Sequence, residues 1–149
     1  MLTKEQQQRK EELQRRRDAS PEEKERQASV GRLSSRFRDL HRTLIDRARD
    51  DYSALYGPPG SPVALLDLIK SHESFMWLRP MTEALVSLDE AIDRGAVQDE
   101  RRAIENLHRL MSFENPGFAA QYRVVLQMDP EVAIARAALQ RPLDEYLAS

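Results

Sequence analysis

The chain has 149 residues, of which 40% are hydrophobic, 32% are charged and none is cysteine. This length and apolar content suit one domain with a hydrophobic core. Without cysteine, disulfides, thiolate nucleophiles and thiolate metal sites are excluded. The net charge of −2 lacks the excess of clustered cations that phosphate binding requires, so we do not expect a nucleic-acid partner.

The sequence also favours a cytoplasmic protein. Residues 1–10 contain no apolar run of the kind that a signal peptide has. No stretch approaches the length of apolar sequence that is needed to span a bilayer. We therefore expect no contact with a membrane.

Residues 1–19 are predicted to form a charged, solvent-exposed arm, either helical or disordered. Between positions 3 and 18 the only large apolar residue is Leu13. Thr3 with Gln6 matches a capping box, and acidic residues interleave with the basic ones, which favours a solvated helix. The functional alternative is an arm that binds RNA or a protein partner through three arginines, Arg15, Arg16 and Arg17.

The pair Ser20-Pro21 predicts the start of a long helix, because serine is a favoured N-cap and proline is tolerated at the first helical position. One apolar stripe with helical spacing then continues to Tyr56. Glycine and proline between Gly57 and Gly60 end the helix. The stripe consists of Val30, Leu33, Phe37, Leu40, Leu44, Ala48, Tyr52 and Leu55.

Residues 61–94 concentrate large apolar side chains and the only tryptophan, so we expect this stretch to form the core. Ser61-Pro62 predicts a helix to about His72, where it either stops or continues into a second helical segment that kinks or restarts near Pro80. Gly95 offers a C-terminal stop. The inward face of the second helix is predicted to comprise Leu78, Met81, Leu85, Leu88 and Ile92, with Arg79, Glu83, Ser87, Glu90 and Arg94 opposite.

The remaining sequence predicts three further helices. Periodicity indicates one over Val97–Met111, and the pairs Asn115-Pro116 and Asp129-Pro130 open the other two. No run alternates with period two for long enough to make a strand. The expected fold is all-α, an antiparallel bundle of about four main helices with short extra helices. We assign residues 20–141 to this bundle domain and 142–149 to a C-terminal tail.

Glu105 and His108 show the Glu-x-x-His spacing that places two metal ligands on one side of a helix. A di-iron site needs a second such pair, but Arg38 and Ile69 stand three residues before His41 and His72. The bland explanations are that His108 lies among core residues, that His41 borders the stripe of the long helix, and that His72 complements a helix C-terminus. The sequence leaves open whether these histidines have a functional role.

We assign no catalytic, cofactor-binding or metal-binding residue. The sequence contains no Gly-x-Ser-x-Gly elbow and no glycine-rich phosphate loop. These absences favour a protein that is not an enzyme and that needs no cofactor.

Asp89 and Arg136 are the two charges that interrupt predicted apolar faces. Asp89 falls next to Leu85 and Ile92, and Arg136 falls between Val132 and Leu139. A desolvated charge is tolerated only when it is paired, so we predict that these two residues form one buried ion pair that sets helix register. A ligand-binding pair is the alternative.

The segment FMWLRPMTEALVSLDE resembles a family of small, uncharacterised all-helical bacterial proteins that share a Phe-x-Trp-Leu-Arg-Pro core followed by Leu-x-x-x-Asp. The match comprises Phe75, Trp77, Leu78, Arg79, Pro80, Leu85 and Asp89. DPEVAIARAAL near the C-terminus is similar to the ending of that family. The resemblance implies a helical fold and no particular activity.

Together these patterns predict a non-enzymatic helical module that acts through a protein partner or through self-association. The amphipathic helices or the N-terminal arm would supply the contact. The alternative is a bundle that binds a metal or small ligand through His108, Glu105 and one other histidine.

Overall fold

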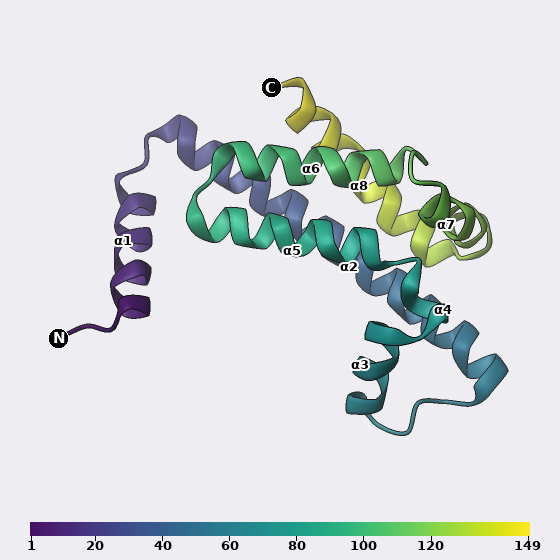
Figure 1. Ribbon diagram of the computed structural model, residues 1–149. Helices are drawn as coiled ribbons and strands as arrows, with labels where there is room; N and C mark the ends of the chain where they lie inside the picture. Colours follow the sequence, from purple (N-terminus) through teal and green to yellow (C-terminus); the bar gives the residue numbers. More distant parts are fainter.

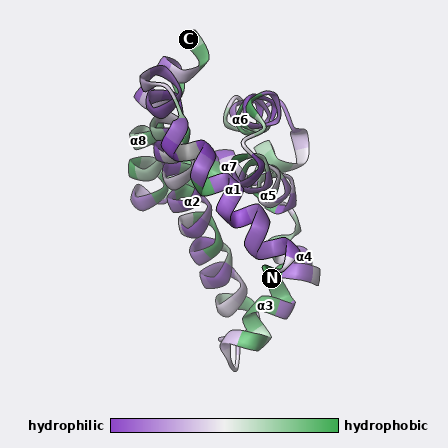
Figure 2. Ribbon diagram, turned by 90° about the vertical axis from the view of Figure 1, so that its left-hand side faces the viewer, coloured by the Kyte–Doolittle hydropathy of each residue, from purple (hydrophilic) through white to green (hydrophobic). Residues whose placement is uncertain are grey.

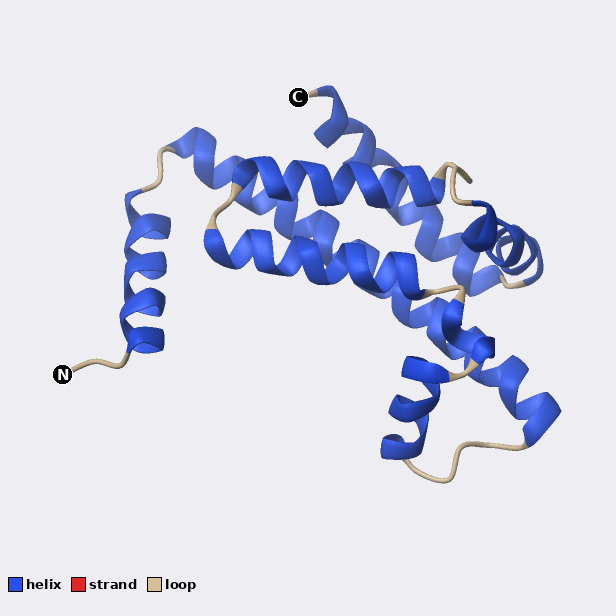
Figure 3. Cartoon of the chain, viewed as in Figure 1, coloured by secondary structure: helices blue, strands red, loops and turns tan.

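The computed structural model describes residues 1–149, apart from the side chain of Arg16 (Figure 1). Its helices are α1 (Lys4–Asp18), α2 (Pro21–Tyr56), α3 (Pro62–Ser71), α4 (Glu73–Met76), α5 (Arg79–Arg94), α6 (Val97–Met111), α7 (Pro116–Met128) and α8 (Pro130–Ala148). Within the described chain, Figure 3 shows only helices and the loops that join them. This confirms the predicted all-α class.

The four predicted cap-and-proline starts are confirmed. Each cap side chain accepts a hydrogen bond from a backbone amide in the first turn of the following helix, at 3.0 to 3.2 Å. Such bonds satisfy amides that have no partner inside the helix. The caps are Ser20 of α2, Ser61 of α3, Asn115 of α7 and Asp129 of α8.

A kink or a restart of the helix was predicted near Pro80, and the structure shows a restart, with α4 ending at Met76 and α5 beginning at Arg79. Because α5 begins at Arg79, Pro80 lies in the first turn, where its missing amide proton breaks no helical hydrogen bond. At the other end Gly95 has a φ of 64°, a left-handed conformation that glycine adopts readily. The predicted inward face is buried at Leu78, Met81, Leu85 and Leu88 and half-buried at Ile92, and the five residues predicted opposite are exposed.

The body of the molecule consists of α2 up to Ala48 together with α5, α6, α7 and α8. The longest helix is α2, and in Figure 1 it runs behind α5 and α6. It packs against α8 and α5, while α5 packs against α6, and α7 against α8. The two-residue connection after α5 returns α6 beside it. Large side chains such as Phe37, Phe75, Phe118 and Tyr122 are almost fully buried between these helices.

The apolar stripe of α2 is buried from Val30 to Ala48, but the prediction that it continues inward to Tyr56 is wrong. Leu55 and Tyr56 are 76% and 59% exposed. The prediction that residues 61–94 form the core is wrong for its first part, since no residue of the fully described α3 is buried. The physical reason is that α2 extends past the end of the body and α3 lies at this extension (Figure 1).

Residues 142–149, which the sequence sets apart as a tail, continue α8 to Ala148. Pro142 lies inside the helix, and beyond it Leu143 and Tyr146 are 0% and 7% exposed. The last turns of α8 therefore belong to the body.

The predicted arm is helical. Its start carries the expected capping box, in which the amide of Gln6 donates to Thr3 Oγ1 at 3.1 Å and the amide of Thr3 donates to Gln6 Oε1 at 3.0 Å. α1 projects from the body and touches it through Arg15, whose Nη1 donates to the carbonyl of Arg94 at 2.9 Å. In the described part of the chain, no helix combines the length and apolar character of a membrane span.

Candidate interaction surface

Four exposed apolar side chains lie on the last turn of α2 and the first turns of α3. Leu55, Tyr56, Val63 and Leu66 are between 55% and 76% exposed, and we call these four residues the tip patch. Figure 2 shows hydrophobic colouring on much of α3, in contrast to the hydrophilic α1. Isolated exposed apolar residues are common on proteins, but several on adjoining elements mark a candidate contact surface.

The sequence of α3 makes it apolar on two sides. Leu65, Leu68 and Ile69 are half-buried and pack against the core. Val63 and Leu66, three residues apart, share a different face of the helix and stay in solvent. Asp67 and Lys70 stand four residues after Val63 and Leu66 and share their face, so the uncovered side of α3 carries two apolar and two charged side chains.

Four rings hold α3 and α4 against the end of α2. The His72 ring lies 5.0 Å from Tyr52 and 5.3 Å from Tyr56, centre to centre, and Tyr52 lies 6.1 Å from Phe75. Such edge and tilted ring contacts stabilise beyond simple area burial. His72 follows the last residue of α3, as predicted, and its Nδ1 also accepts a hydrogen bond from the amide of Ser74 at 3.1 Å, which caps α4. The tip patch is thus carried on a braced support.

The charges near the tip patch are mostly acidic. From Asp50 to Glu73 the chain contains four acidic side chains and one basic side chain, Lys70. Asp67 and Lys70 lie on α3 itself and are exposed. The part of the tip patch on α3 is therefore accompanied by one exposed acidic and one exposed basic side chain of the same helix.

The predicted ion pair between Asp89 and Arg136 is wrong. Asp89 pairs instead with Arg38 of α2, and the two side chains are 41% and 57% exposed, so neither is a buried charge. Arg136 is half-buried and lies near Tyr122, where burial raises the pKa of the tyrosine hydroxyl and the charge of Arg136 opposes this. Helical periodicity places Asp89 and Arg136 beside apolar residues of their own helices, but the partner of Asp89 depends on how the helices pack against one another.

Among the described side chains the buried charge is Glu100, which the sequence analysis missed. Glu100 is 3% exposed, and both its carboxylate oxygens accept from Arg26 Nη1, at 2.8 and 3.1 Å. The pair joins the start of α6 to the start of α2. A signal was present, since Glu100 stands three and four residues before Ala103 and Ile104, which mark the inward face of α6.

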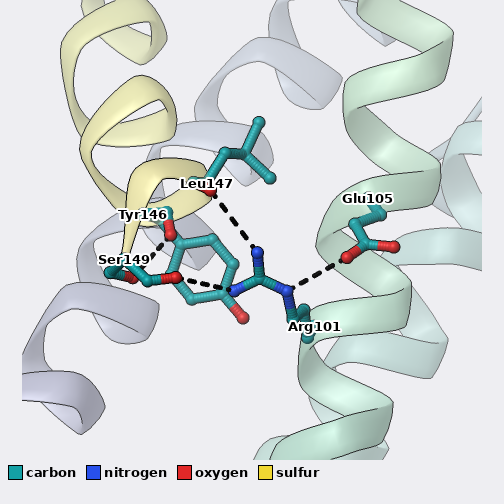
Figure 4. A network of polar contacts seen from close by, with 5 residues as sticks. All are labelled: Arg101, Glu105, Tyr146, Leu147 and Ser149. Carbon is teal, nitrogen blue, oxygen red and sulfur yellow. Dashed lines mark hydrogen bonds and ion pairs between the residues drawn. The ribbon is translucent and has the colours of Figure 1, made fainter.

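The Glu105 and His108 pair is not joined by a further ligand. Glu105 accepts from Arg101 Nε at 3.1 Å, and Arg101 also donates to the carbonyls of Leu147 and Ser149 at 3.4 Å (Figure 4). His108 Nδ1 is buried without a hydrogen-bond partner among the described residues. Within the described residues no three His, Asp or Glu side chains are placed to hold one metal ion. Arg101, held by Glu105 within α6, thus fastens α6 to the end of α8.

His41 joins α2 to α5 through a 2.8 Å hydrogen bond between its Nε2 and Thr82 Oγ1. Burial lowers the pKa of this imidazole, because the charged form would lose hydration. His41 thus has a structural contact rather than a place in a cluster of ligands.

A cavity of about 510 Å³ lies between α1 and the body. It is lined by Arg15 of the arm and by Arg26, Glu100 and Ile92, among others. Of the three arginines predicted as a possible binding element, Arg15 contacts the end of α5, and the side chain of Arg16 lies outside the described residues.

The fold and its surfaces define an all-helical protein with one braced, exposed apolar tip. No family model matches the chain, and comparisons with curated proteins and with solved structures returned no match. The resemblance of the Phe75 to Asp89 segment to a helical bacterial family stays a prediction.

Proposed function

We propose that this protein is a protein-interaction module whose contact surface is the tip patch. The observation that carries the proposal is that α3, an apolar helix with a well-formed cap, buries none of its residues in the isolated chain. In this proposal α2, α5, α6 and α8 form the antiparallel bundle that holds the tip in place. No enzymatic step is assigned to the module.

The support lies in the contrast between local order and exposure. The ring contacts around His72 and the hydrogen bond from Arg79 Nη2 to the carbonyl of Lys70, at 3.0 Å, fix α3 in one position. A surface that is ordered before binding loses little conformational entropy on binding, which favours affinity. Exposed apolar side chains on such a support are typical of the centre of a protein interface.

Site-specific photo-crosslinking in cells that naturally produce this protein tests the proposal. A photoreactive residue in place of Leu66 should give a protein adduct, whereas the same residue in place of Glu83, exposed on α5, should give little. The adduct at position 66 should disappear when Val63→Glu is introduced beside it. Equal labelling at both positions, or none at position 66, would exclude the tip patch as a contact surface.

A further inference from the structure

Building on the proposed interaction function, we propose that the partner of the tip patch is the tip patch of a second copy of this chain. The two copies would meet about a two-fold axis, with their α3 helices antiparallel. In such an interface both copies use the same surface, so each contact between two different residues occurs twice. The product is a symmetric dimer joined at its tips, with the two bodies pointing apart.

The exposed area of the tip patch is enough for a weak, reversible dimer. From their exposed fractions, the four residues of the tip patch present on the order of 500 Å² per copy, so two copies bury on the order of 1,000 Å². This value lies below the roughly 1,200 to 2,000 Å² of stable specific interfaces and within the range of transient ones. Neighbouring side chains add a rim, because α3 and the end of α2 adjoin in each copy.

The charges on α3 are self-complementary. Asp67 and Lys70 lie one turn apart and are both exposed. When a second α3 runs antiparallel with the two-fold axis between Asp67 and Lys70, Lys70 of each copy lies opposite Asp67 of the other, so two opposite-charge contacts form beside the axis. In this register Val63 and Leu66 of each copy lie toward the end of the other α3, where Tyr56 packs against His72. A parallel arrangement would instead bring like charges together.

The same charges argue against an anionic membrane as the occupant. Surface-binding helices carry several lysines or arginines beside their apolar face. At the tip Lys70 and Arg79, whose Nη2 donates to the carbonyl of Lys70, are outnumbered by the four acidic residues from Asp50 to Glu73. The N-terminal arm of another copy does not fit either, since α1 offers the tip patch one apolar side chain, Leu13, between Lys4 and Asp18.

Sedimentation equilibrium of the full chain tests the apolar part of the interface. The unmodified protein should reach a monomer–dimer equilibrium, and Leu66→Glu should weaken it by at least about 30-fold, as loss of a central interface residue does. Val63→Glu should act similarly. The matched control is Val86→Glu, which introduces the same charge at a valine that is 51% exposed on α5 and should leave the equilibrium unchanged. Circular dichroism should show the same helix content for all of these proteins.

A charge exchange tests whether the partner is a second copy with the proposed orientation. Asp67→Lys and Lys70→Asp should each weaken self-association, because each puts like charges opposite one another. An equimolar mixture of the two single variants should associate better than either alone. The double variant Asp67→Lys with Lys70→Asp should recover the association of the unmodified protein.

Two results would overturn the dimer. One is a chain that stays monomeric in sedimentation up to high micromolar concentration. The other is a dimer that Val86→Glu weakens as much as Leu66→Glu does. If the chain is monomeric but position 66 still crosslinks a different protein in the cell, the interaction function stands and only the identity of the partner is wrong. If position 66 crosslinks nothing and the chain is monomeric, both proposals fail.

Discussion

The two longer helices outside the body, α1 and α3, differ in how well their exposed side chains are hydrated. α1 is polar almost throughout, with a capping box at its start and one described hydrogen bond from Arg15 to the body. α3 is mostly apolar, and its Val63 and Leu66 face solvent. Exposure costs α1 little, because its side chains are hydrated. Covering Val63 and Leu66 of α3, in contrast, would lower the free energy. Equal exposure therefore has different meanings at the two ends of the molecule.

The largest expected effect is a loss of folding stability, and the same substitution, leucine to alanine, compares the body with the tip. Leu85 is 6% exposed, so Leu85→Ala should destabilise the fold by about 2 to 5 kcal/mol. Leu66→Ala should change the free energy of unfolding by less than about 0.5 kcal/mol when the protein is dilute enough to be monomeric. Urea unfolding of both variants measures the difference. Similar losses at the two sites would place α3 in the core and end the distinction between tip and body.

Arg26→Ala should have the next largest effect. It leaves the carboxylate of Glu100, which is 3% exposed, without its cation, and an unpaired buried charge costs about 3 kcal/mol or more. Glu100→Gln should cost less, because the Arg26 side chain is 29% exposed and can be hydrated. Thermal and urea unfolding of the two variants would reveal this order. The reverse order would mean that Arg26 is the more deeply desolvated partner.

Features that depend on neighbouring residues could be predicted from the sequence, whereas features that depend on contacts between distant helices could not. Caps such as Ser61 and Asn115 act within one helical turn, so the helix starts were predictable. The partner of Asp89 depends on which helix packs beside α5, and it proved to be Arg38 rather than Arg136. Periodicity finds an apolar face on a helix but does not say what covers it, and for this reason α3 was mistaken for core.

The candidate surface could not be predicted as such, for the same physical reason. An apolar face reads identically in the sequence whether it meets the same chain, another chain or water. Glu100 is different, since a charge on the inward stripe of α6 was visible and was overlooked. Its partner Arg26 lies on a distant helix and required the structure.

A smaller effect concerns pH and belongs to the body. Burial lowers the pKa of His41 below its ordinary value of 6.5, so the unfolded chain takes up a proton there before the folded chain does. Stability should therefore fall as the pH drops below about 6.5. His41→Gln should make the decline between pH 7 and pH 5 shallower in denaturant titrations, while carboxylate protonation remains common to both proteins. An unchanged pH profile would show that His41 titrates normally.

The smallest expected effect is at the arm. Deleting residues 1–19 removes almost no buried apolar surface, although it removes the bond from Arg15 to the carbonyl of Arg94. We expect a loss below about 1 kcal/mol, the contribution of a single exposed hydrogen bond. Calorimetry of the truncated chain tests this, with Arg15→Ala as the matched point variant. A fall of many degrees in the melting temperature would mean that α1 is part of the body.

Amide hydrogen exchange at two protein concentrations tests the contrast between the outlying helices most directly. In the dilute protein, the amides of Lys4–Asp18 and of Pro62–Ser71 should both exchange faster than those of the body. In the concentrated protein, exchange in α3 should slow while exchange in α1 stays fast, because only the tip patch becomes covered. Slowing in α1 with no change in α3 would contradict the account, since the contact surface would then be the charged arm.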